Sequence, residues 1–140
     1  MDVRIRILLT MIDEHAGVLE MSSRQIGSLL GLSEARVLRL FNSEVGKPLR
    51  SHAREVRMAR AAELLKECVT PIKMIASRCG YTTASNFHRD FKMVHGISPM
   101  QMRLIYMESS CTPYEHRRRK STFDRSRIQE LRSACFPVIR

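Results

Sequence analysis

The chain has 140 residues, which is enough for one large domain or two small ones with a real core. Its hydrophobic content of 44% and charged content of 27% are those of a soluble globular protein, and no stretch approaches the ~18 consecutive apolar residues of a membrane span. Lys and Arg outnumber Asp and Glu by 24 to 14, which gives a net charge of +10. This excess favours a polyanionic partner, nucleic acid ahead of any other, over a charge that only keeps the protein in solution.

The elements predicted along the chain are all helices. Apolar residues at helical spacing mark a first helix that starts near Val3 and ends near Gly17. Ser22 opens the next helix with Gln25 as its capping-box partner, and later helices are expected to end at glycines. The helices expected after Gly31 cover residues 33–45, 48–66, 71–79, 83–95 and 98–106. Beyond residue 106 we expect a basic, partly flexible tail, 107–140, which is linker-like to about residue 123.

The apolar positions predict which side chains are buried. The first two helices are expected to turn one apolar stripe each toward the core, formed by Val3, Ile7, Leu8, Met11 and Ile12 and by Ile26, Leu29 and Leu30. The methionines Met93, Met100 and Met102 are interpreted as gap-filling core residues.

The four cysteines give no sign of a metal site. Cys68, Cys79, Cys111 and Cys135 form no CxxC pair, and no histidine stands at zinc-finger spacing from a pair. We therefore expect reduced thiols in a cytosolic protein, with no metal and no cofactor. The basic run at residues 117–120 adds either nonspecific attraction to phosphate or a solvated tail.

Two segments of the chain repeat one pattern. IGSLLGLSEARVLRLFNSEVGKPL and IASRCGYTTASNFHRDFKMVHGISP both run from Ile, a small residue and Ser to a glycine, then to a helix with Arg two places before Phe. Each reads as a short helix, a glycine turn and a second helix, which is the arrangement of a helix-turn-helix. The first is expected at about 23–44 and the second at about 71–95, joined by a long arginine-rich linker helix at about 48–66. The predicted fold class is therefore all-α, with two helix-turn-helix subdomains.

The second segment also carries a longer and more specific pattern. Its residues fit P-I-x-x-I-A-x-x-x-G-F/Y, then F-x-R-x-F-K, then G-x-S-P, from Pro71 to Pro99, with Arg103 four residues further on. Residues from about Val3 to Tyr106 therefore resemble the DNA-binding domain of the AraC/XylS family of bacterial transcription regulators. One departure is Met102, where the family usually has Tyr or Phe, and we expect it to change packing in the last helix and not DNA contact.

The resemblance implies which residues meet double-stranded DNA, because side chains near the start of a recognition helix contact base edges. Arg39 and Arg89 are candidates for guanine, Asn86 for adenine, and Ala35 and Leu38 for a thymine methyl. Ser33 and Thr83 are expected to cap helices whose N-termini touch phosphate. Arg39 and Arg89 have a competing interpretation as surface arginines paired with carboxylates, which for Arg89 is Asp90. The full candidate set is Ser33, Ala35, Arg36, Leu38, Arg39, Thr83, Ala84, Ser85, Asn86, His88 and Arg89.

The predicted function is sequence-specific binding of promoter or operator DNA by a transcription regulator of the bacterial cytoplasm, associated with the nucleoid. We expect an activator with RNA polymerase as a further partner, and recognition helices about 34 Å apart if the linker helix is rigid. The alternative is a protein-interaction module that docks on RNA polymerase or another regulator without reading DNA. An enzyme is disfavoured, because the chain shows no catalytic triad, phosphate loop or metal cluster. Only about two residues precede the first helix, so no ligand-sensing domain is expected ahead of it in this chain, which resembles either the small stand-alone members of the family or the carboxyl-terminal part of a longer regulator.

Overall fold

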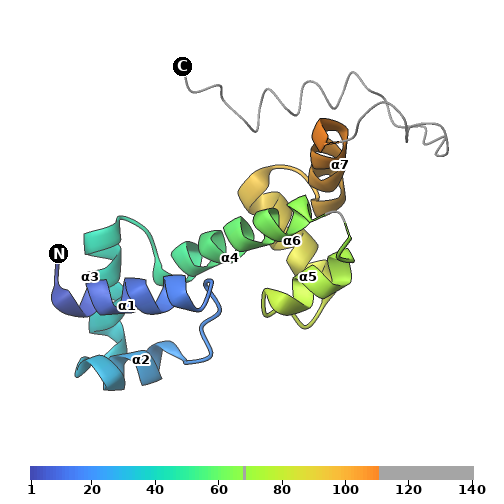
Figure 1. Ribbon diagram of the computed structural model, residues 1–140. Coiled ribbons are helices and arrows are strands. Elements are labelled where there is room, and N and C mark those ends of the chain that lie inside the picture. Colours follow the sequence, from blue (N-terminus) through green and yellow to red (C-terminus); the bar gives the residue numbers. More distant parts are fainter. Residues whose placement is uncertain (68, 111–140) are drawn as a thin grey trace, which may run out of the picture. The chain divides into compact units, whose positions relative to one another are not determined.

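The computed structural model describes residues 1–67 and 69–110, and every regular element in these two ranges is an α-helix (Figure 1). The all-α prediction is confirmed. The predictions made for Cys68, and for the tail from residue 111 onward with its cysteines and basic run, lie outside the described residues. The helices are α1 (Val3–Glu14), α2 (Ser23–Leu30), α3 (Glu34–Val45), α4 (Leu49–Lys66), α5 (Ile72–Arg78), α6 (Ala84–His95) and α7 (Pro99–Ser110).

The chain divides into two compact units. The first unit is Met1–Ala61 and the second begins at Ala62, so the boundary falls inside the predicted linker helix, α4. Each unit contains one of the two repeated segments, as α2 and α3 in the first and as α5 and α6 in the second. Each repeat therefore has packing partners within its own unit.

The core of the first unit is built on one stripe of α1. Ile5, Leu8 and Ile12 are fully buried there, at spacings of three and four residues. The predicted stripe was partly wrong, because Val3 and Ile7 are exposed and Ile5 is inside. Periodicity alone allowed two neighbouring stripes on this helix, and contact with the rest of the unit selects the one through Ile5. The remaining buried members of this core are Ile26, Val37, Phe41, Leu49 and Ala53.

A capping carboxylate fixes where α1 starts. The Asp2 side chain accepts a hydrogen bond from the backbone N–H of Arg4 at 2.9 Å and two more from the Arg4 guanidinium. These hydrogen bonds hold the pKa of the Asp2 carboxyl below its usual value, the side-chain bond from Arg4 being the largest cause.

Gly27 explains why Leu29 is not in the core. Leu29 was predicted to face inward, yet 59% of its surface is exposed. The buried residue beside Ile26 on α2 is Gly27, and a Cβ added to it would lie 2.7 Å from the carbonyl oxygen of Leu32. Gly27 therefore faces inward, and because an α-helix has 3.6 residues per turn, Leu29, two residues later, lies on the other side of α2 and points into solvent.

The core of the second unit is aromatic. Phe87 and Phe91 on α6 are fully buried, with ring centroids 5.8 Å apart, and Ile75 of α5 is buried as well. Met102 of α7 is also buried, so the residue that departs from the family pattern fills core space as predicted. Met93 and Met100 are exposed, Met93 by 61%, and their prediction as core residues was wrong. The inward side of α6 is occupied by Phe87 and Phe91, and that of α7 by Met102 and Ile105.

A second capping box begins α7. The Ser98 backbone N–H donates to the side chain of Gln101 at 2.9 Å, and the Ser98 hydroxyl accepts from the Gln101 backbone N–H at 3.2 Å. This helix continues to Ser110, four residues beyond the predicted end. No Gly or Pro stands between Met100 and Ser110 to stop it.

Candidate nucleic-acid interface

The turns inside the two repeats have the same hydrogen bonds. In the first, Gly31 donates to the carbonyl of Ser28 at 3.3 Å and Leu32 to that of Gly27 at 2.8 Å. In the second, Gly80 donates to the carbonyl of Ser77 and Tyr81 to that of Ala76, both at 3.0 Å. Gly31 and Gly80 have φ angles of 67° and 79°, the left-handed conformation that glycine adopts at no steric cost. The sequence repeat is therefore a repeat of local structure.

The exposed side of α3 carries most of the first candidate set. Ala35, Arg36 and Arg39 are exposed, while Val37 and Phe41 on the opposite side are buried. The Arg39 Nε–H donates to the backbone carbonyl of Ala35, one turn earlier in the same helix, at 3.4 Å. Arg39 is therefore held along the surface of its own helix, with its charged end at the solvent.

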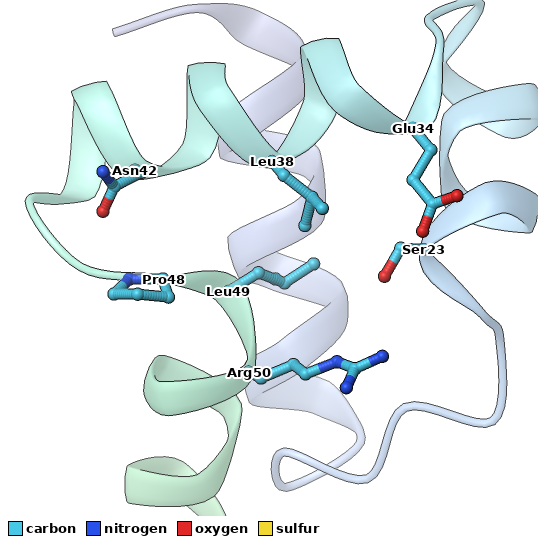
Figure 2. A pocket seen from close by; sticks show the side chains of 7 residues that line it. All are labelled: Ser23, Glu34, Leu38, Asn42, Pro48, Leu49 and Arg50. Carbon is cyan, nitrogen blue, oxygen red and sulfur yellow. The ribbon is translucent and has the colours of Figure 1, made fainter.

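Leu38 is placed differently from its neighbours. It is half-buried and packs against the core of the first unit. Figure 2 shows it projecting from α3 toward Leu49, in a hollow between α3, the start of α2 and the start of α4. The hollow is lined by Ser23, Glu34, Leu38, Asn42, Pro48, Leu49 and Arg50. Ser23 and Arg50 were not among the residues predicted from the sequence; they lie on α2 and α4 and border α3 in the fold.

The exposed side of α6 carries the second set. Ala84, Ser85, Asn86, His88 and Arg89 are all exposed, whereas Phe87 and Phe91 point into the core. The polar residues therefore share the outer surface of one helix, as predicted. The rings of His88 and Phe87 form an edge-on pair, with centroids 6.1 Å apart and planes at 67°.

The two predicted caps are not equivalent. The Ser33 hydroxyl accepts a hydrogen bond from the Arg36 backbone N–H at 3.3 Å, so it caps α3 as expected. Thr83 occupies the N-cap position of α6 with extended backbone, but its side chain makes no capping hydrogen bond. The prediction that Thr83 caps α6 is thus confirmed for its position, while its side chain takes no part in the capping.

A buried carboxylate stands directly beside Arg89. Asp90 is only 8% exposed, and its Oδ1 lies 3.5 Å from the Arg89 Nε. Its Oδ2 accepts a hydrogen bond from the Tyr81 hydroxyl at 2.8 Å. The sequence indicated Asp90 as a partner for Arg89, but Tyr81, nine residues away and in the turn, was not foreseen as a third member.

Comparison with known proteins agrees with this geometry. A family model described as "Helix-turn-helix domain" matches residues 26–105, which include both repeats. The chain belongs to the AraC/XylS-type helix-turn-helix family. This is a family of DNA-binding domains of transcription regulators and not an enzyme class.

Two curated relatives and one solved structure illustrate the membership. The chain is 28% identical over 88 residues to the multiple antibiotic resistance protein MarA of Escherichia coli strain K12, and 35% identical over 65 residues to the F1 operon positive regulatory protein of Yersinia pestis. These matches cover 63% and 46% of this chain, and 69% and 22% of the relatives. This chain therefore corresponds to only part of the Yersinia pestis protein, which is the longer of the two relatives.

The solved C-terminal domain of AraT, a response regulator from Geobacillus stearothermophilus, has the same fold. It is 30% identical, with a TM-score of 0.72, and the match covers 84% of this chain and 98% of that domain. Among the described residues, none of the helices has the length and apolar character needed to cross a membrane.

Proposed function

We propose that the chain is a sequence-specific regulator of transcription that binds promoter or operator DNA through α3 and α6, each in the major groove. The observation that supports this most directly is the repeated turn, since α3 and α6 follow identical hydrogen-bonding patterns and each exposes polar residues on its outer side. In helix-turn-helix proteins this second helix reads base edges.

The proposed base-reading residues are Ala35, Leu38 and Arg39 on α3 and Ala84, Ser85, Asn86, His88 and Arg89 on α6. Arg36 lies on the same exposed side of α3. Ser33 and Thr83 precede these helices, and their positions suit contact with phosphate at the helix N-termini. Thr83 is the better candidate for a direct hydroxyl contact, because its side chain is not engaged in capping α6.

The further proposal is that both helices engage one DNA site, in major-groove segments about 34 Å apart on the same side of the duplex. Activation through RNA polymerase, in the nucleoid of the cytoplasm, completes the proposed role. It is supported by the Yersinia pestis relative, whose description is that of a positive regulatory protein.

Footprinting of a selected operator tests engagement of both helices. We expect two protected segments one helical turn apart, with Arg39→Ala weakening protection at one and Arg89→Ala at the other. Arg6→Ala removes the same charge from the exposed side of α1 and should leave the pattern intact. A single protected segment that Arg39→Ala does not alter would contradict binding through α3.

Base preference tests the role of Arg89 separately. Arg89→Ala should relax the preference at one base pair, worth about 1–3 kcal/mol for a bidentate arginine–guanine contact. Arg78→Ala, in α5, is the matched control and should keep the base preference. If Arg89→Ala weakened binding to all sequences equally, Arg89 would be a phosphate contact.

A further inference from the structure

Asp90 is the one charged residue that is buried in the part of the chain that the structure describes. It lies on α6 between Arg89, on the outer side, and Phe91, in the core. A carboxylate removed from water is unfavourable unless it is paired and hydrogen-bonded. The burial of the Asp90 carboxylate therefore has to be offset by its hydrogen bond and its ion pair.

Each oxygen of Asp90 has its own partner. Oδ2 accepts from the Tyr81 hydroxyl at 2.8 Å, and Oδ1 lies 3.5 Å from the Arg89 Nε. Tyr81 is itself fixed, because its backbone N–H donates to the Ala76 carbonyl in the turn and its ring packs edge-on against Phe87, with centroids 5.6 Å apart. The position of the carboxylate is thus set from the turn and the core, and not from the DNA-facing side.

The Asp90 carboxylate restrains the side chain of Arg89, which would otherwise be mobile. The Arg89 side chain is 68% exposed, so solvent alone would leave it many rotamers. An ion pair at Nε holds the inner part of the guanidinium and leaves the two terminal amino groups for a partner outside the protein. Arginine reads guanine through paired N–H donors directed at O6 and N7, so a fixed guanidinium loses less freedom on binding.

The first repeat has no such arrangement at the matching positions. Leu32 and Leu40 stand where the second repeat has Tyr81 and Asp90. Arg39, the counterpart of Arg89, instead donates its Nε–H to the Ala35 carbonyl. The two recognition helices therefore hold their arginines by different means.

We propose that Tyr81 and Asp90 are positioning residues that set the Arg89 guanidinium for base recognition, and so sharpen the discrimination of α6 at the base pair that Arg89 reads. The proposal rests on the proposed function, in which Arg89 contacts a base. The carboxylate orients Arg89, and the Tyr81 hydroxyl orients the carboxylate.

The test measures dissociation constants for the full chain on four duplexes that differ only at the base pair whose preference Arg89→Ala relaxes. Tyr81→Phe removes one hydroxyl, and Asp90→Asn removes the charge while keeping an acceptor for Tyr81. We expect each to reduce discrimination among the four duplexes by about two- to tenfold. Tyr106→Phe removes a hydroxyl from α7 in the same unit and should leave discrimination unchanged.

A double-mutant cycle separates positioning from general support of the fold. In the Arg89→Ala background, Tyr81→Phe and Asp90→Asn should have no further effect on discrimination. Equal weakening on all four duplexes, or effects that add to that of Arg89→Ala, would overturn the positioning role. Full discrimination in both variants would overturn it as well. If Arg89→Ala itself left base preference unchanged, the failure would lie in the proposed function, and the positioning role would fall with it.

Discussion

At the scale of single residues, the close approach of α2 to the backbone around Leu32 depends on Gly27. Its counterpart in the second repeat is Ala76, which is buried without difficulty. The hydrogen-bonded turn is the same in both repeats, yet only the first brings the Leu32 carbonyl within 2.7 Å of where a Cβ would stand. Packing therefore requires glycine at position 27 of the first repeat, whereas the matching position 76 of the second repeat accommodates alanine.

Gly27→Ala should consequently destabilise the first unit. Alanine is the better helix former by up to about 1 kcal/mol, but its methyl group would force the backbone apart, and overpacking of this kind costs about 1–3 kcal/mol. Urea unfolding followed by circular dichroism measures the change. Ser28→Ala, on the exposed side of the same helix, should stay within about 0.5 kcal/mol. A higher midpoint for Gly27→Ala would show that the backbone can move apart there.

At the scale of elements, the helix starts are fixed by different groups. α2 and α7 begin with reciprocal capping boxes, Ser22 with Gln25 and Ser98 with Gln101, while α6 begins at Thr83 without a side-chain cap. The start of the proposed recognition helix α6 is thus less firmly held by its own sequence than the helix that follows it. Its stability derives from Phe87 and Phe91 in the core.

Two substitutions within the second unit test this difference. Ser98→Ala removes a capping acceptor and should lower the free energy of unfolding by about 1 kcal/mol. Thr83→Ala removes no cap and should change it by less than about 0.5 kcal/mol. Thermal and urea unfolding of both variants give the comparison. Equal losses would mean that the Thr83 hydroxyl supports α6 in solution after all.

At the scale of the whole molecule, the net charge of +10 is the property most relevant to DNA. Phosphate neutralisation by Lys and Arg releases counterions, so the affinity should fall linearly with salt on logarithmic axes. For about six phosphate contacts made by the two units together, the loss between 50 and 200 mM salt is roughly a thousandfold. A gel-shift titration measures this slope. Tight binding to RNA polymerase, combined with DNA binding that shows no sequence preference and is lost at 200 mM salt, would favour the interaction module instead.

The sequence was most informative where the physics is local. Ser22 with Gln25, Ser98 with Gln101 and the glycines at 31 and 80 are local signals, and the structure has the caps and turns where they predict them. The errors concern contacts made at a distance. Ile5 rather than Ile7, and Gly27 rather than Leu29, are selected by what packs against the helix, which periodicity does not specify.

In the candidate interface, too, local features could be predicted from the sequence and contacts between separate elements could not. That the polar residues of α6 share its exposed side could be read from their spacing around Phe87 and Phe91. The link from Tyr81 to Asp90 could not, because it needs the turn to bring the ring back against α6. The sequence shows only a tyrosine and an aspartate nine residues apart.

The hydrogen bonds of the two turns join backbone groups alone. Apart from the glycine that each turn needs, they do not depend on which side chains α3 and α6 display. Substitutions on the exposed sides of these helices can therefore accumulate during evolution with little loss of folding. The two repeats already differ at nearly every exposed position of their second helices while keeping one turn. On the proposed function, in which α3 and α6 each read one half of the DNA site, such a scaffold lets the two halves change separately, so that a duplicated gene acquires a new regulatory target in small, separately tolerated steps.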